Sequence, residues 1–187
     1  MGDIVAETKD MLMDAAEIGI RKKGYNAVSF RELADDLGIK SASVHYYFRK
    51  KEDLGLALVI RYKYRFFEAL NGQAEGAKGP ADKVAAFCKT YRDALISSEA
   101  ICLGGMLGAE TCSLPDKLAK EVSEFFEANI RWLEAELPSE WSVKKRRARA
   151  GQIVATLQGA MMLATNLKDT DLFDRTAENL LIDIALE

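Results

Sequence analysis

The sequence predicts an all-α protein whose N-terminal part contains a helix-turn-helix. Apolar residues recur at helical spacing in one segment after another along the 187 residues, and no segment has the alternating pattern of a convincing strand. Pro80, Pro115 and Pro138 all fall at boundaries between periodic segments, where an all-helical chain tolerates proline. With 49% apolar residues, the chain has ample material for a packed core.

The first expected helix starts near Thr8 and ends before Gly24. Its apolar stripe consists of Met11, Leu12, Ala15, Ala16, Gly19 and Ile20. Three basic residues at 21–23 fall in the last turn, where cations suit the negative end of the helix dipole. Gly24 is a natural residue for ending a helix, because it adopts the left-handed conformation without strain.

Two short helices are expected next. Ser29 followed by Glu32 is a capping box, in which each side chain satisfies a free backbone N–H of the other residue. Gly38 ends this helix after barely two turns. The stretch "SASVHYYF" then reads as a second short helix, with Val44 and Phe48 one turn apart on its inner side. Two short helices joined by a tight turn containing glycine describe a helix-turn-helix.

The rest of the chain predicts longer helices. A linker-like stretch, "NGQAEGAKGP", separates the first of them from the others. The expected helices cover residues 52–70, 84–95, 118–133, 142–167 and 170–185.

The distribution of charge indicates where DNA would bind. The net charge of −3 disfavours nucleic acid for the whole chain, but residues 40–65 carry seven basic residues against two acidic ones. A short helix fits the major groove, and serine, histidine and tyrosine side chains supply hydrogen-bonding groups for bases and phosphates. A bland alternative stays open, since short helices with a glycine turn occur in many helical proteins. The single histidine, His45, would then be an ordinary surface residue.

Several function classes are not expected. No run of about 18 uncharged apolar residues is present, and the acidic N-terminus is unlike a secretory signal, so a cytoplasmic protein without membrane contact is expected. Three irregularly spaced cysteines suggest neither a disulfide framework nor a metal site. Without a glycine-rich phosphate loop, and with one histidine, the chain is expected to be neither an enzyme nor a cofactor protein.

The stretch "GYNAVSFRELADDLGIKSASVHYYFRKKEDL" at residues 24–54 resembles the DNA-binding region of the tetracycline-repressor (TetR) family of transcriptional regulators. The matching elements are Gly24-Tyr25, the Ser29 cap, Leu33-Ala34, Leu37-Gly38-Ile39, Tyr46-Tyr47-Phe48, Lys51-Glu52 and Leu54. The resemblance implies about nine helices, with a helix-turn-helix DNA-binding domain at 1–51 and a helical ligand-binding and dimerisation domain at 52–187. It also implies a ligand-responsive regulator, usually a repressor, on a double-stranded palindromic operator.

The resemblance assigns roles to individual residues. The residues that would face bases or groove walls are Arg31, Ser41, Ala42, Ser43 and His45. The residues that would contact backbone phosphates are Tyr46, Tyr47 and Lys51. The last two helices would pair with a second subunit. Their apolar faces comprise Ile153, Val154, Leu157, Ala160 and Met161, and Leu172, Phe173, Leu180, Leu181 and Ile184. The alternative is that these faces pack within one chain.

An effector pocket is expected between the central helices. We expect its lining to include Phe87, Tyr91, Met106, Trp132, Met161 and Met162, although residues of these types are more often core. Cys102 precedes a glycine-rich helix, where the helix dipole would favour a reactive thiolate, and the competing interpretation is a buried structural thiol. An unchanged response of Cys102→Ser to an electrophile would exclude a sensor role.

Two further alternatives stay open. The basic run "KKRRAR" at residues 144–149 suggests a second nucleic-acid patch, a solvated face or an acidic partner surface. The main rival to a DNA-binding regulator is a helical small-molecule-binding or interaction module without affinity for DNA.

Overall fold

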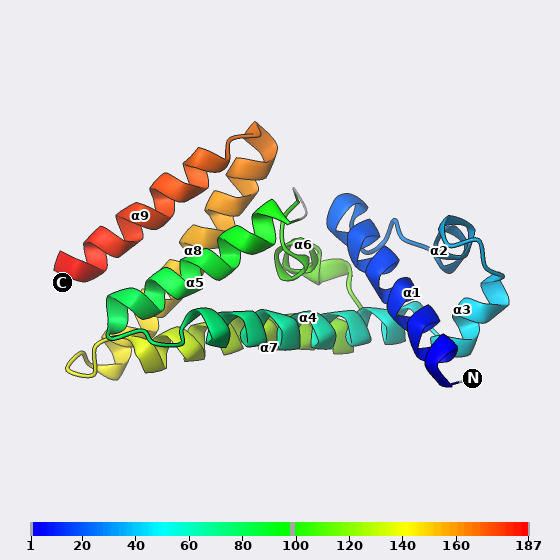
Figure 1. Ribbon diagram of the computed structural model, residues 1–187, viewed down its shortest axis with the longest axis horizontal. Helices are drawn as coiled ribbons and strands as arrows, with labels where there is room; N and C mark the ends of the chain where they lie inside the picture. Colours follow the sequence, from blue (N-terminus) through cyan, green and yellow to red (C-terminus); the bar gives the residue numbers. More distant parts are fainter. Residues whose placement is uncertain (1, 98–99, 187) are drawn as a thin grey trace. The chain divides into compact units, whose positions relative to one another are not determined.

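The computed structural model describes residues 2–97 and 100–186, with side chains at 7–97 and 100–182. Within these ranges every regular element is a helix (Figure 1). The elements are α1 (Gly2–Lys23), α2 (Phe30–Asp36), α3 (Ser41–Tyr47), α4 (Lys51–Gln73), α5 (Pro80–Ile96), α6 (Leu103–Ala109), the 3-10 turn η1 (Thr111–Ser113), α7 (Asp116–Glu136), α8 (Val143–Leu167) and α9 (Thr170–Leu186). The predicted all-α fold class is therefore confirmed.

Local signals place most helix ends where they were predicted. Gly24 follows α1 with a φ of 87°, and Gly38 follows α2 with a φ of 64°, so both use the left-handed region that glycine enters freely. Pro80 occupies the first turn of α5. The hydroxyl of Ser142 caps α8 by accepting the backbone N–H of Lys145 at 3.2 Å.

Several helix boundaries differ from the prediction, and one element was not predicted. Helix α1 starts at Gly2 rather than near Thr8, and α4 continues to Gln73, inside the segment taken as a linker. The turn η1 was not predicted. Helix α6 contains three glycines in seven residues, so its propensity is poor and packing must stabilise it. Its Leu103 and Leu107 are fully buried, which supplies that packing.

The chain forms two compact units. The first unit comprises residues 1–62 and 103–123. In it α1 packs against α2 and α6, and α2 packs against α3 (Figure 1, blue to cyan for α1 to α3). The buried side chains include Leu12, Ile20 and Leu33, each at most 2% exposed. Burial of one such side chain contributes about 1.5–3 kcal/mol, so this core holds α2 and α3 in place.

The second unit comprises residues 63–102 and 124–187. Helices α5, α8 and α9 pack pairwise against one another (Figure 1, green, orange and red). An aromatic cluster fills part of the core, with ring centres of Phe66 at 5.5 Å from Phe125 and at 5.4 Å from Tyr91. Edge-to-face pairs of this kind add about 0.5–1.5 kcal/mol beyond burial.

The apolar face predicted for dimerisation on α8 packs inside the second unit instead. Ile153, Val154, Leu157, Ala160 and Met161 are all at most 5% exposed, and Phe173 and Leu180 of α9 are buried as well. The side chain of Ile184 lies outside the described residues. At these buried positions the structure agrees with the alternative interpretation, in which the apolar faces pack within one chain.

Candidate functional site

The turn between α2 and α3 is built by short-range hydrogen bonds. The Ser29 hydroxyl accepts the N–H of Glu32 at 3.2 Å, and the Glu32 carboxylate accepts the N–H of Ser29 at 3.0 Å, so the predicted capping box is present. The N–H of Ile39 donates to the carbonyl of Ala34 at 2.9 Å and closes the helix end. Helix α3 starts after Lys40, which makes no side-chain cap. These bonds direct α3 away from the axis of α2 within three or four residues.

Helix α3 is anchored through one residue. Only Val44 is buried in α3, with 0% exposure, and Phe48 directly after the helix is 4% exposed. The predicted base-contacting and phosphate-contacting residues of α3 lie outward or half-buried: Ser41, Ala42, His45 and Tyr46 are exposed, and Ser43 and Tyr47 are intermediate. Tyr46 has the largest exposed fraction among the exposed large apolar side chains of the described residues, at 75%. The helix therefore presents hydroxyls, a phenol and an imidazole to solvent.

Rings orient the outward face of α3. The ring of His45 lies edge-on to Phe30 of α2, with the centres 5.0 Å apart, and Tyr46 contacts Tyr47 edge-on at 5.1 Å. Edge-to-face contacts of this kind are favourable. The ring of His45 therefore packs beside Phe30 of α2.

The basic side chains around α3 differ in their surroundings. Arg31, Arg49 and Lys50 are exposed. Lys51 is half-buried, its ammonium donates to the carbonyl of Asn26 at 3.2 Å, and it lies 4.4 Å from the ring centre of Tyr25. Burial lowers the pKa of Lys51 below its ordinary value, and the charges of Glu110 and Glu32 oppose that shift. Of the predicted phosphate contacts Tyr46, Tyr47 and Lys51, only Lys51 carries a positive charge. Its ammonium contacts Tyr25 and Asn26 of the same unit.

The predicted effector residues separate into three groups. Phe87, Tyr91, Cys102 and Met161 are at most 1% exposed and lie in the second unit, where Trp132 stacks on Phe87 at 5.8 Å. Met162 is 47% exposed and does not join these buried side chains, because it lies on the outer side of α8. Met106 belongs to α6 of the first unit.

A polar cluster lies inside the aromatic core of the second unit. The Tyr91 hydroxyl donates to the Asn129 side-chain oxygen at 3.4 Å, and the Gln158 amide donates to Tyr91 at 3.2 Å and to the Cys102 sulfur at 3.4 Å. Typical O–H···O bonds are about 2.7–2.8 Å, so the bond from Tyr91 to Asn129 is long for a buried site, whereas the bond from Gln158 to Tyr91 lies within the ~2.7–3.2 Å range of N–H···O bonds. Burial is the main cause that raises the pKa of Tyr91 above its ordinary value.

Two members of this cluster were missed in the sequence. Asn129 lies four residues after Phe125, and Gln158 lies between Leu157 and Met161, so both are polar residues on apolar helix faces. That irregularity was the available signal. Cys102 was expected at the start of a helix and directly precedes α6, but its thiol is 1% exposed. Its burial matches the structural interpretation, and a reagent would have to enter the core to reach it.

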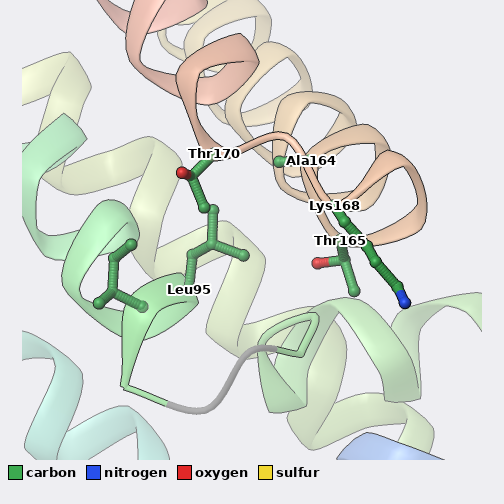
Figure 2. Close-up of a pocket in the computed structure, with 6 residues that line it drawn as sticks. Leu95, Ala164, Thr165, Lys168 and Thr170 are labelled. Carbon is green, nitrogen blue, oxygen red and sulfur yellow. The ribbon is translucent and has the colours of Figure 1, made fainter.

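An open pocket lies elsewhere in the second unit, where the end of α5 meets the junction of α8 and α9 (Figure 2). Its volume is about 440 Å³, and it is lined by Leu95, Ile96, Ala164, Thr165, Lys168 and Thr170. None of the predicted effector residues is in this lining. Lys168 has a φ of 54°, a conformation that non-glycine residues rarely adopt.

The basic run at residues 144–149 has an acidic partner on α7. Arg147 donates two hydrogen bonds to Glu127, both at 2.7 Å, and lies 3.6 Å from Glu134. The ammonium of Lys145 lies 3.6 Å from the ring centre of Trp141. These contacts favour the acidic-surface interpretation of the run over a second nucleic-acid patch.

Among the residues that the structure describes, no cluster of histidine, cysteine and carboxylate side chains is suited to hold a metal ion. None of the helices in that part of the chain is long and apolar enough to cross a membrane.

Two family models match the sequence. The model for "Bacterial regulatory proteins, tetR family" matches residues 12–58 and so includes α2 and α3. The model for "Transcriptional regulator LmrA/YxaF-like, C-terminal domain" matches residues 80–179, which is more than half of the chain. The first match covers the N-terminal helix-turn-helix region. The second covers a C-terminal region that has its own family model.

Individual relatives agree with these matches. The crystal structure of a TetR transcriptional regulator from Legionella pneumophila has a TM-score of 0.86 and 30% identity, covering 92% of this chain and 95% of that one. The transcriptional regulator AcuR of Cereibacter sphaeroides is 32% identical over 101 residues, which are 52% of this chain and 46% of AcuR. The transcriptional repressor NemR of Escherichia coli is 24% identical over 115 residues, 60% of this chain and 58% of NemR. The chain thus matches about half the length of these two curated relatives.

Proposed function

The chain belongs to the TetR family of ligand-responsive, DNA-binding transcriptional regulators, and we propose that it acts as a dimeric repressor that an effector releases from a palindromic operator. Helix α3 carries the proposal, because its polar face is exposed while Val44 is its one buried residue. We assign DNA contact to residues 1–51, through Arg31, Ser41, Ala42, Ser43, His45, Tyr46, Tyr47 and Lys51. Effector binding and dimerisation are assigned to residues 52–187.

The proposed dimer interface uses a second stripe on α8. Ala155, Gly159, Met162 and Leu163 are exposed and follow one another at helical spacing. Met162 and Leu163 are 47% and 50% exposed, and a Cβ added at Gly159 would meet no atom within 4 Å. Large apolar residues beside small ones suit close packing of two helices. This stripe replaces the buried α8 face as the candidate contact with a second subunit.

The proposed effector site is the buried cluster around Tyr91, Cys102 and Gln158, with Phe87, Trp132 and Met161 beside it. Its long hydrogen bond between Tyr91 and Asn129 favours a small molecule whose polar group makes a shorter one. Such a ligand lowers the affinity for the operator only if it binds the DNA-free state more tightly than the DNA-bound state. The loss of operator affinity is set by the difference between these two affinities for the ligand. Helix α4 has residues in both units and is the proposed route between them.

Rival functions receive less support. The relatives named above are described as transcriptional regulators, and the family is not a family of enzymes. A binding module without DNA affinity leaves the exposed polar face of α3 without a role. A cytoplasmic location follows from the proposed DNA partner.

Selection of bound duplexes from a random DNA pool tests the proposal. We expect enrichment of a palindrome whose half-sites lie about 34 Å apart, one helical turn, because two α3 helices read one face of the duplex. Recovery of no preferred sequence would favour the module without DNA affinity.

The Leu163→Glu substitution tests the dimer interface. We expect it to shift sedimentation equilibrium towards monomer and to weaken palindrome binding, because two opposed carboxylates would replace an apolar contact. Val143→Glu, also exposed and on α8, is the matched control and should leave the assembly unchanged. A Leu163→Glu protein that sediments like the control would exclude this interface.

A further inference from the structure

The loop between α1 and α2 is fixed by a carboxylate that follows α6. The backbone N–H of Tyr25 donates to the Glu110 carboxylate at 2.7 Å, a short charge-assisted bond. The preceding Gly24 has a φ of 87°, and a Cβ placed there would overlap a Glu110 carboxylate oxygen. Any other side chain would be strained at this φ and would displace the end of the Glu110 side chain.

A second bond joins the same two segments. The amide of the Asn26 side chain donates to the Ser113 hydroxyl at 3.0 Å. That hydroxyl in turn donates to the backbone carbonyl of Glu110 at 3.0 Å, and the N–H of Ser113 donates to the same carbonyl at 2.8 Å. The turn η1 thus places Glu110 and Ser113 side by side, each against one residue of the loop.

The other side of the loop holds Lys51. The carbonyl of Asn26 accepts a hydrogen bond from the Lys51 ammonium at 3.2 Å, and the ring of Tyr25 lies below that ammonium at 4.4 Å. Tyr25 and Asn26 therefore each contact Lys51 and each contact the segment after α6. All of these residues belong to the first unit.

We propose that Glu110 is a positioning residue for DNA binding, which fixes the Tyr25-Asn26 loop so that the Lys51 ammonium is held ready for a backbone phosphate. The proposal rests on the proposed role of Lys51 as a phosphate contact. It assigns a binding role to a residue outside the helix-turn-helix, nearly 60 positions after Lys51.

Preorganisation is the physical reason for an effect on affinity. A free lysine side chain loses rotamer freedom when it binds, and that ordering costs free energy. The Asn26 carbonyl and the Tyr25 ring contact the Lys51 ammonium before DNA arrives, and the bond to Asn26 uses one of the three donors of an ammonium group. When Glu110 becomes an amide, its bond to the Tyr25 N–H loses the charge-assisted part. The loop is then held less firmly, and so is Lys51.

A double-mutant cycle on the selected operator tests this. The variants are Glu110→Gln, Lys51→Ala and their combination, and exposed Glu140→Gln is the matched control. We expect Glu110→Gln to weaken binding about twofold to thirteenfold, the range that corresponds to the ordering cost of one long side chain. Lys51→Ala should reduce the magnitude of the negative slope of log K against log salt by about one. Glu110→Gln should also reduce the magnitude of that slope. The double variant should bind no more weakly than Lys51→Ala.

The outcomes separate the two proposals. Failure of the unsubstituted protein to bind any duplex would overturn the proposed function together with this inference. Normal operator binding by Glu110→Gln, or effects of Glu110→Gln and Lys51→Ala that multiply in the double variant, would overturn the inference alone. If Glu110→Gln does not fold, Ser113→Ala removes the second bond to the loop. Ser113→Ala should reduce operator affinity less than is expected for Glu110→Gln, and it should have no effect in the Lys51→Ala background. A reduction of operator affinity that persists in that background would overturn the inference.

Discussion

Val44→Asp is expected to abolish DNA binding and to lower the free energy of unfolding of the first unit by about 3–5 kcal/mol, because it buries an unpaired carboxylate. Val44 is the sole buried residue of α3 and is 0% exposed. A charge there has either to stay in the core or to reach solvent by moving the helix. Thermal unfolding by circular dichroism measures the loss of stability, and fluorescence anisotropy with the selected operator measures the loss of binding.

Tyr46→Asp is the matched control, since it puts the same charge on the same helix at a position that is 75% exposed. We expect its thermal midpoint to stay close to that of the unsubstituted protein, because surface substitutions usually change stability by less than about 0.5 kcal/mol. Its DNA affinity should still fall, since a carboxylate on the outer face of α3 repels phosphate. Equal stability of the Val44→Asp and Tyr46→Asp proteins would show that Val44 does not anchor α3.

Phe87→Ala is expected to lower the free energy of unfolding of the second unit by about 3–5 kcal/mol. The Phe87 side chain is 0% exposed, and its ring lies 5.1 Å from Tyr91, 5.8 Å from Trp132 and 6.1 Å from Phe66. Removing it leaves a cavity that these rings fill only partly. Denaturant unfolding followed by tryptophan fluorescence measures the change, with a signal that comes from Trp132 and Trp141 together.

Ile96→Ala is the control for this substitution, because Ile96 lies on the same helix and is 46% exposed. We expect it to change the unfolding midpoint far less than Phe87→Ala does. A Phe87→Ala protein no less stable than Ile96→Ala would contradict the close packing of the aromatic cluster.

The helix-turn-helix was predictable because its signals are local. The Ser29 and Glu32 side chains satisfy backbone groups within three residues, and Gly38 permits the turn, so the sequence alone determines both. The outward direction of His45 and Tyr46 followed from helical spacing around Val44. No distant contact is needed for any of these features.

The effector region was less predictable because its geometry depends on distant contacts. Tyr91, Asn129 and Gln158 come from three different helices, and only their packing makes them neighbours. The apolar stripes of α8 were equally ambiguous, since periodicity alone does not say which stripe meets α9 and which meets another chain. The contact of Glu110 with Tyr25 spans 85 residues and involves no motif.

Salt-dependent binding to the selected operator tests the central claim, that α3 and the basic residues around it form the DNA-binding surface. The affinity of the unsubstituted protein should fall steeply with salt and exceed its affinity for a scrambled duplex. Arg31→Ala should reduce that preference, whereas Lys144→Ala, exposed in the basic run of α8, should change neither affinity nor slope. Loss of binding in Lys144→Ala with normal binding in Arg31→Ala would contradict the account and move the DNA-binding surface to α8.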